Sequence, residues 1–211
     1  MRSRETLPVR DPDDLALDPP DDHTVHGVVL AAGQSSRYGP ENKLLEPLAG
    51  TPLVAHAVET AVDAAVDGVT VVVGYEADAV RAALDEFDVA FRTNEAYAAG
   101  QSTSLACGVA AARERGADAV VVLLGDMPHV ATGTVDLLIA AYAGSAYDAL
   151  AAAFEGKRGN PVLFDSAYFE ALADVEGDVG GREILLERAD AVAVETGDPG
   201  VLQDIDRPTD R

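Results

Sequence analysis

Short apolar runs alternate with segments of helical periodicity along most of this 211-residue sequence, and this alternation constrains the fold more than any other feature. Single buried strands are predicted at 28–32, 69–73, 89–91 and 119–124. Thr51 can cap a helix that begins at Pro52, and apolar side chains at helical spacing predict helices at 52–66, 76–87 and 100–114, with a further helix that Thr132 can cap. Strand and helix in this order predict an α/β fold with a doubly wound, mostly parallel sheet.

The two ends of the chain follow this pattern less closely. Residues 1–24 combine prolines with a run of aspartates, a composition that cannot bury enough apolar surface to fold alone. We therefore expect an acidic, Pro-rich arm that is disordered or loosely docked. From 147 onward we expect shorter strands and helices, at 147–154, 160–164, 166–173, 181–187 and 191–194. Neither a repeat nor a linker interrupts 25–211, which predicts a single domain there.

The charge of the chain limits its partners. The formal net charge is −22, from 37 acidic and 15 basic residues. Nucleic acid and anionic membranes would be repelled, so neither is expected to bind. We interpret the charge as halophilic adaptation, because high salt screens self-repulsion, although an ordinary acidic protein is the alternative. The chain lacks an apolar signal-peptide core and any run of membrane-spanning length, which predicts a cytoplasmic protein.

The loop after the first predicted strand carries the first functional signal. Gly33 ends the apolar run, and the polar stretch that follows contains Arg37, Gly39 and Lys43. Loops at the carboxyl ends of parallel strands bind ligands, and two cations in so acidic a chain point to phosphate. Lys43 does not directly follow Gly39, so the loop is not a P-loop. The glycine pattern of dinucleotide-binding folds is also incomplete, which disfavours an NAD-type oxidoreductase.

Two acidic motifs suggest a metal site. Asp126 follows the predicted strand 119–124, where an aspartate is costly unless it is bound to something. Mg²⁺ favours one or two carboxylates together with phosphate oxygens. Near the C-terminus, Asp204 and Asp206 flank Ile205 and would share one face of an extended segment. Spacing alone does not separate these two aspartates from a solvated acidic tail.

Several motifs in one order resemble the nucleotidyltransferases of molybdenum cofactor synthesis, the MobA-like NTP transferase family. They lie at 30–39 with Lys43, at Asn94 with 100–105, and at 123–128, 158–164, 177–182 and 204–208. Within the family, Ala32 and Gly125 are more similar to the cytidylyltransferases than to the guanylyltransferases. The sequence departs from the family at Tyr38, where methionine is usual, and at Arg207, where threonine is usual.

The resemblance implies a Rossmann-like three-layer α/β/α sandwich of the nucleotide-diphospho-sugar transferase type. It also implies that the protein transfers CMP from CTP to a phosphate-bearing acceptor, molybdopterin cofactor, and releases pyrophosphate. By residue, the resemblance assigns the base and ribose to the backbone of Leu30, Ala31, Ala32 and Gly33, and the triphosphate to Arg37 and Lys43. It assigns further nucleotide contacts to Asn94, Ser102 and Ser104, and Mg²⁺ to Asp126 and Asp206. It assigns the acceptor to Arg158, Asn160, Pro161, Asp178 and Arg182. Arg37, Lys43 and Asp126 would be the catalytic residues.

Alternatives remain open at this point. The donor could be GTP, and the acceptor could be a sugar phosphate or another cofactor phosphate. A different class is an accessory protein of a molybdenum enzyme that binds nucleotide or cofactor without transfer. The presence of Arg37, Lys43, Asp126 and Asp206 argues against it, because a pure binder would not need a pair of metal ligands. A molybdenum enzyme or its chaperone is a possible partner for product delivery.

Overall fold

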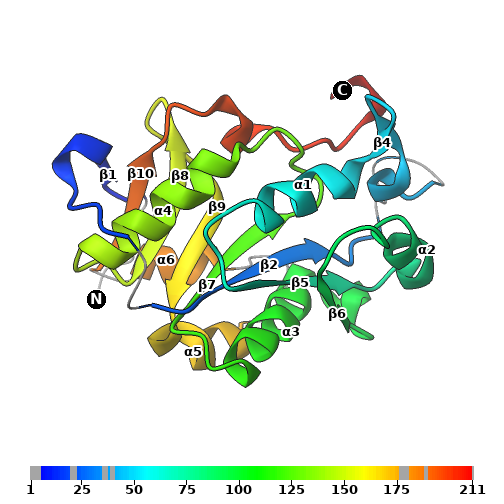
Figure 1. Cartoon of the computed structure of the whole chain (residues 1–211), viewed down its shortest axis with the longest axis horizontal. Helices are drawn as coiled ribbons and strands as arrows, with labels where there is room; N and C mark the ends of the chain where they lie inside the picture. The colour runs from blue at the N-terminus through cyan, green and yellow to red at the C-terminus, as the bar shows by residue number, and fades with distance from the viewer. Residues whose placement is uncertain are drawn as a thin grey trace.

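The computed structural model describes residues 6–19, 23–34, 38, 41–175, 181–187 and 190–210. A central sheet of eight strands lies between two layers of helices (Figure 1). From one edge to the other, the strands follow the order β1 (Val9–Arg10), β10 (Ala191–Glu195), β8 (Ala149–Phe154), β9 (Lys157–Asp165), β7 (Ala119–Leu124), β2 (Val25–Ala31), β5 (Gly68–Val73) and β6 (Ala90–Thr93). A separate two-stranded ladder joins β3 (Pro47–Leu48) and β4 (Thr51–Pro52).

The sheet is parallel except at one strand. β9 runs antiparallel to both of its neighbours, β7 and β8, and the remaining pairs of adjacent strands are parallel. In the middle of the sheet, β2 lies between β7 and β5, with Leu30 opposite Leu124 on one side and Val72 on the other. The carboxyl ends of β2, β5 and β7 therefore meet at one edge of the sheet, as the strand pattern predicted.

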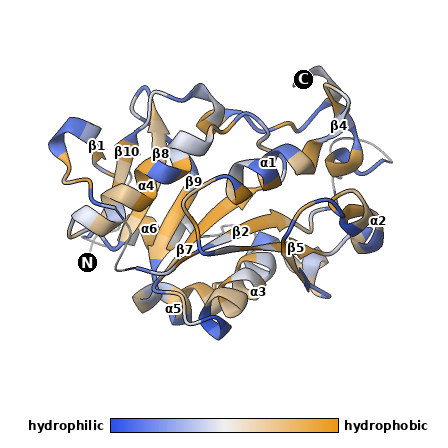
Figure 2. Cartoon of the chain, viewed as in Figure 1, coloured by the Kyte–Doolittle hydropathy of each residue, from blue (hydrophilic) through white to orange (hydrophobic). Residues whose placement is uncertain are grey.

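Among the described residues, six α-helices cover the two faces of the sheet (Figure 1). Residues of α1 (Leu53–Val62), α2 (Ala77–Ala82) and α4 (Thr132–Gly144) belong to one apolar cluster, and residues of α3 (Gln101–Glu114), α5 (Phe169–Ala173) and α6 (Arg182–Glu187) belong to the other. Small side chains let the layers approach closely, as at Gly108, where an added Cβ would lie within 2.4 Å of Val28 Cγ1. Figure 2 shows that hydrophobic residues concentrate in the strands and hydrophilic residues in the surrounding loops and outer helix faces. The predicted three-layer α/β/α sandwich is confirmed.

Several boundaries differ from the sequence pattern. α1 ends at Val62 and α2 at Ala82, earlier than the predicted helices at 52–66 and 76–87. Thr51 and Pro52 form β4 rather than a cap and a first helical turn, and α1 has no side-chain cap. β9 extends from Lys157 to Asp165 because it pairs with strands on both sides, which favours a longer extended segment than the apolar run at 160–164 predicts.

The N-terminal arm is ordered where the structure describes it, at 6–19. Leu7 is buried against the face that α3 and α5 cover, and β1 pairs with β10 through Val9 opposite Ala193. The amide of Asp18 donates to Ala140 O in α4 (3.2 Å). Composition alone does not predict these contacts, because it does not reveal that the edge of β10 offers the arm backbone partners. Residues 1–5 and 20–22 lie outside the described residues.

Across the described residues, every helix is too short or too polar to cross a membrane.

Candidate active site

Lys43 enters the site on a short 3₁₀ helix, η2 (Lys43–Leu45), and its neighbours hold it there. Asn42 Oδ1 caps η2 by accepting a hydrogen bond from the amide of Leu44 (3.1 Å). The side chain of Leu44 is buried in the apolar cluster beneath α1. Because the cap and the buried leucine fix the turn, the Lys43 side chain is directed toward the carboxyl edge of the sheet.

One ammonium group joins the two predicted metal ligands. Lys43 Nζ donates to Asp126 Oδ2 at 2.8 Å and to Asp206 Oδ1 at 2.9 Å. The lysine side chain is 11% exposed, and the side chains of Asp126 and Asp206 are 24% and 31% exposed. Three residues far apart in the sequence thus converge on one point. Asp204, the alternative to Asp206, is exposed and takes no part in this contact.

Burial and charge act on Lys43 in opposite directions. Burial by itself lowers the pKa of the ammonium, because a charged group loses hydration there. The negative charge of Asp126, its hydrogen bond and the corresponding contacts of Asp206 outweigh this effect and raise the pKa of Lys43 above its usual value. Lys43 is therefore a fixed positive charge at neutral pH.

Asp126 is held by its own backbone. It begins the turn after β7, where the amide of Gly125 donates to Leu30 O (2.9 Å) and that of Met127 to Leu124 O (3.1 Å). A Cβ on residue 125 would lie 3.1 Å from Leu30 O, so glycine permits the close approach of β7 and β2 here. The carbonyl of Asp126 accepts a hydrogen bond from the amide of Ile205 (2.9 Å). That bond ties the Asp126 turn to the segment that carries Asp206.

The C-terminal segment brings Asp206 to this edge. After β10, the chain forms the 3₁₀ helix η5 (Pro199–Leu202) and then continues to Asp206 and the 3₁₀ helix η6 (Pro208–Asp210) (Figure 1). Ile205 is 1% exposed and anchors the segment, and the amides of Asp206 and Arg207 donate to Asp210 Oδ2 at 3.1 and 2.7 Å. The segment is irregular rather than a strand, so alternation along an extended chain did not separate Asp204 from Asp206.

A third aspartate, which the sequence analysis missed, fastens this segment. Asp198 Oδ2 accepts hydrogen bonds from the amide of Ala131 (2.9 Å) and from Thr134 Oγ1 (2.7 Å), both at the start of α4. Its other oxygen caps η5 through the amide of Gly200 (2.8 Å). Asp198 thus connects the loop after Asp126 to the segment before Asp206. The Asp198-Pro199 pair was a helix-start signal in the sequence, but nothing in it pointed to α4.

The predicted nucleotide residues on α3 lie together. Asn94, just after β6, donates through Nδ2 to Thr103 Oγ1 (2.8 Å) and Ser104 Oγ (2.9 Å), and its Oδ1 accepts from the amide of Ala96 (2.9 Å). Asn94 therefore ties the end of β6 to the first turn of α3. Ser102 is 1% exposed, and its hydroxyl has no hydrogen-bond partner among the described residues. An unpaired buried hydroxyl is costly, which singles out Ser102 at the start of this helix.

The loop to which the resemblance assigns the base begins at the end of β2, next to two tyrosines. Ala32 is buried and accepts a hydrogen bond from the amide of Tyr75 (3.2 Å), whereas Gly33 is exposed and faces open space. Tyr75 and Tyr97 form an edge-to-face pair with ring centroids 6.4 Å apart. A Cβ on Gly74 would lie 2.8 Å from Tyr97 Cβ and 2.9 Å from Ala32 Cβ, so Tyr97 lies close to the loop. Arg37 lies outside the described residues.

The predicted acceptor residues are only partly brought to the site. Asn160 on β9 contacts Met127 through Nδ2 and Sδ (3.6 Å), which places it beside the Asp126 turn, and Arg158 and Pro161 lie on the same strand. Arg182 begins α6, on the face that α3 and α5 cover, and its side chain is outside the description. Asp178 also lies outside the described residues.

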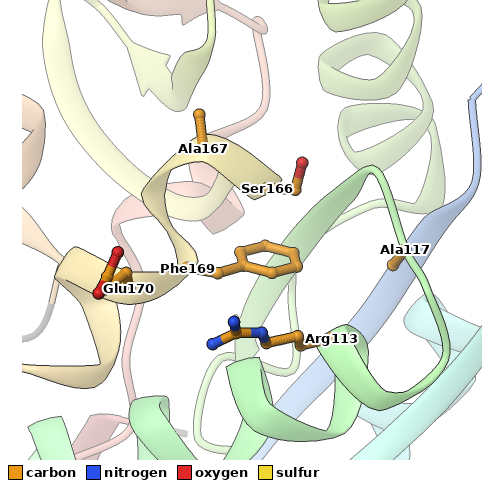
Figure 3. Close-up of a pocket in the computed structure, with 6 residues that line it drawn as sticks. All are labelled: Arg113, Ala117, Ser166, Ala167, Phe169 and Glu170. Carbon is orange, nitrogen blue, oxygen red and sulfur yellow. The ribbon is translucent and has the colours of Figure 1, made fainter.

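A hollow of about 350 Å³ elsewhere in the fold does not belong to this site. It opens between the end of α3 and the segment formed by η4 (Ser166–Tyr168) and α5. Figure 3 shows the ring of Phe169 between Ser166 and Arg113, with Glu170 directed away from that ring. Ala117 precedes β7 and Ser166 follows the antiparallel β9, so the hollow lies at the edge where the parallel strands begin. The Lys43 cluster lies at the opposite edge.

The fold, together with the Lys43, Asp126 and Asp206 cluster at the carboxyl edge of the sheet, is that of a nucleotide-binding α/β protein that acts on phosphate groups. Comparison with known families narrows the class, because the MobA-like NTP transferase domain matches residues 27–192. The chain therefore belongs to the MobA-like NTP transferase family, and the protein is a nucleotidyltransferase.

Two relatives match nearly the whole chain. The purine catabolism protein PucB of Bacillus subtilis is 32% identical over 195 residues, covering 86% of this chain and 91% of its own. The nicotine blue oxidoreductase of Paenarthrobacter nicotinovorans is 31% identical over 191 residues, covering 86% and 92%.

Solved structures agree with the family. A nucleotidyl transferase from Methanothermobacter superposes with a TM-score of 0.77 at 26% identity, covering 89% of this chain and 94% of its own. Rv0371c from Mycobacterium tuberculosis, in complex with manganese, superposes with a TM-score of 0.70 at 30% identity, covering 89% and 95%.

Proposed function

We propose that this nucleotidyltransferase is Mg²⁺-dependent and transfers CMP from CTP to a phosphate-bearing acceptor, molybdopterin cofactor, with release of pyrophosphate. The observation that carries the proposal is the convergence of Lys43, Asp126 and Asp206 at the carboxyl edge of the sheet. A fixed cation and two carboxylates at the carboxyl ends of parallel strands suit a triphosphate and its metal.

The residues fit a divalent cation. One oxygen of Asp126 and one of Asp206 face the same positively charged nitrogen, at 2.8 and 2.9 Å. Two carboxylates arranged around a single cation are the donor set that Mg²⁺ uses beside phosphate oxygens. The manganese complex of Rv0371c, a relative with the same fold, is consistent with a divalent metal in this family.

The reaction needs positioning more than proton transfer. A phosphate oxygen of the acceptor attacks the α-phosphorus of CTP, a new P–O bond forms, and the bond from the α-phosphorus to the bridging oxygen breaks to release pyrophosphate. The acceptor phosphate is already ionised at neutral pH, so no general base is required. When bound, Mg²⁺ would neutralise charge on the α-phosphate. Lys43 and Arg37 would stabilise the departing pyrophosphate, and Asp126 and Asp206 would hold the metal.

Different residues would bind the nucleotide and the acceptor. The unpaired hydroxyl of Ser102, in the first turn of α3, would bind the nucleotide, with the backbone of Leu30 to Gly33 beside the base. The choice of CTP over GTP rests on Ala32, in which the sequence resembles the cytidylyltransferases. On the other side of the Asp126 turn, Asn160 would face the acceptor.

A transfer assay with a matched pair of variants tests this function. The purified protein is incubated with Mg²⁺, one of the four nucleoside triphosphates and molybdopterin, and pyrophosphate release is measured alongside mass spectrometry of the product. We expect a CMP adduct with CTP. Asp126→Asn should lower kcat by about a hundredfold or more, as expected when a group that stabilises developing charge is lost. Asp204→Asn removes the same charge from an exposed residue nearby and should leave kcat near that of the wild type.

Each alternative predicts a different result. Adducts formed from GTP, or with a sugar phosphate in place of molybdopterin, would change the donor or acceptor but keep the class. Nucleotide binding without any adduct would support the accessory protein and contradict the proposal. The loop after β2 lacks the full glycine pattern for a dinucleotide, which argues against an NAD-type oxidoreductase. One relative is nevertheless named a nicotine blue oxidoreductase, so a redox product in place of an adduct would contradict the proposal.

A further inference from the structure

The ammonium of Lys43 occupies the point on which the two proposed metal ligands converge. It lies 2.8 Å from Asp126 Oδ2 and 2.9 Å from Asp206 Oδ1, and the residue is only 9% exposed. From this geometry we infer that Lys43 acts as an internal cation for Asp126 and Asp206 and controls access of a divalent ion to these two carboxylates. This inference rests on the proposed function, because it takes Asp126 and Asp206 as the metal ligands.

Lys43 and a divalent ion are alternatives for this pair of carboxylates. Both would need the same inward-facing oxygens, and two cations close together in a site of low exposure repel each other strongly. The lysine is therefore a competitor for the metal in the free protein. Metal binding requires Lys43 Nζ to leave Asp126 and Asp206.

The contact of Lys43 with the two carboxylates also holds the site together when no metal is bound. Asp126 and Asp206 come from different segments, joined by the hydrogen bond between Ile205 N and Asp126 O. Without a cation, two partly buried carboxylates on these segments would repel each other and move apart. Lys43 keeps them together, so the ligand pair is assembled before any metal arrives.

The lysine also sets an order of binding. A triphosphate is a stronger anionic partner than two carboxylates, and the proposed function places it within reach of Lys43. Phosphate oxygens would draw the ammonium away from Asp126 and Asp206 and free both for the ion. Tight binding of the metal therefore requires the nucleotide, and the nucleotide-free protein binds a divalent ion weakly.

Direct Mn²⁺ binding tests the inference without any turnover. Binding is followed by electron paramagnetic resonance of free Mn²⁺, in nucleotide-free protein at constant KCl. Lys43→Met removes the competing ammonium, and we expect Mn²⁺ affinity to rise about tenfold or more, because hydrogen bonds between charged groups are strong. Lys157→Met is the matched control, since Lys157 is the other lysine of the chain, is exposed and lies in the β8–β9 hairpin. Lys157→Met removes one positive charge, as Lys43→Met does, and should bind Mn²⁺ like the wild type.

A second variant and a Tm measurement keep the inference testable if Lys43→Met folds poorly. Lys43→Gln keeps an amide donor for one carboxylate and loses the charge. In both Lys43 variants, Mn²⁺ should raise Tm more than it does in the wild type, whose carboxylates are already neutralised. Adding Asp126→Asn to Lys43→Met should remove the gain in both affinity and Tm.

Two outcomes would overturn the inference, and they can be told apart. If Mn²⁺ binding depends on Asp126 but neither Lys43 variant binds more tightly than Lys157→Met, the metal site stands and the lysine is not its competitor. If no variant shows Asp126-dependent Mn²⁺ binding, the inference fails together with the metal ligands of the proposed function.

Discussion

His26 is a buried ionisable side chain in the middle of the fold that the site does not use. It lies on β2, is 3% exposed and shares a hydrogen bond between Nε2 and Thr70 Oγ1 (2.9 Å). Burial, and then the positive charge of Arg115, lower the pKa of His26 to about 4, against a smaller opposite effect of Asp67. The folded protein therefore keeps this imidazole neutral at pH values where the unfolded chain protonates it.

This difference predicts a loss of stability in mild acid. Between the unfolded pKa near 6.5 and the folded value near 4, the unfolded chain binds more protons, so the free energy of unfolding falls as pH falls. The loss attributable to His26 should reach about 2 kcal/mol between pH 7 and pH 5. Urea unfolding of the wild type and of His26→Gln at fixed KCl isolates this contribution, because the carboxylates titrate in both proteins. Parallel pH profiles for the two proteins would contradict the prediction.

At the scale of elements, the site depends on two segments that are joined by side-chain and backbone hydrogen bonds. The turn that carries Asp126 leads into α4, and η5 leads toward Asp206. Asp198 joins them through Ala131, Thr134 and Gly200. An aspartate that accepts backbone amides at a helix start contributes stability and also fixes direction. The spacing of the two proposed metal ligands is thus set partly from outside the site.

Loss of this connection should affect both stability and metal binding. Asp198→Ala should lower the free energy of unfolding by about 1–2 kcal/mol, as for loss of a helix cap. It should also weaken Mn²⁺ binding, because the segment that holds Asp206 loses its tie to α4. Thr134→Val removes only one of the three bonds and should give a smaller change in the same direction. A variant that is less stable but binds Mn²⁺ like the wild type would limit Asp198 to a structural role.

The same elements explain what could be predicted from sequence. Buried strands are recognisable from their apolar composition, and the loop after such a strand lies at the ligand-binding edge of the sheet. Lys43 and Asp126 could therefore be predicted as site residues from the sequence. The resemblance assigned Asp206, but spacing alone did not separate it from Asp204, because its position depends on burial of Ile205 and on bonds between distant segments. The tie from Asp198 to α4 joins residues more than sixty positions apart and leaves no local pattern.

At the scale of the whole molecule, charge is the dominant property. The net charge of −22 is spread over a protein of 211 residues, and the acidic side chains lie mostly at its surface. The arm contributes to this layer while β1 covers the backbone edge of β10, so the same residues protect a sheet edge and add to the repulsion. At low ionic strength, like charges repel across the whole surface and favour expansion of the chain.

Salt should therefore stabilise this protein through screening. The Debye length falls from about 10 Å at 0.1 M to about 3 Å at 1 M salt, so most of the rise in Tm with KCl should occur below about 1 M. A continued linear rise above that concentration would instead indicate salt exclusion from the surface. Asp85, Glu86 and Asp88 are exposed neighbours after α2, and their joint replacement by the corresponding amides removes three negative charges without touching the site. That variant should be more stable than the wild type in dilute buffer and nearly equal to it in molar KCl. Equal stability of the two proteins at every salt concentration would show that self-repulsion does not govern the response, and the halophilic interpretation of the charge would then fail.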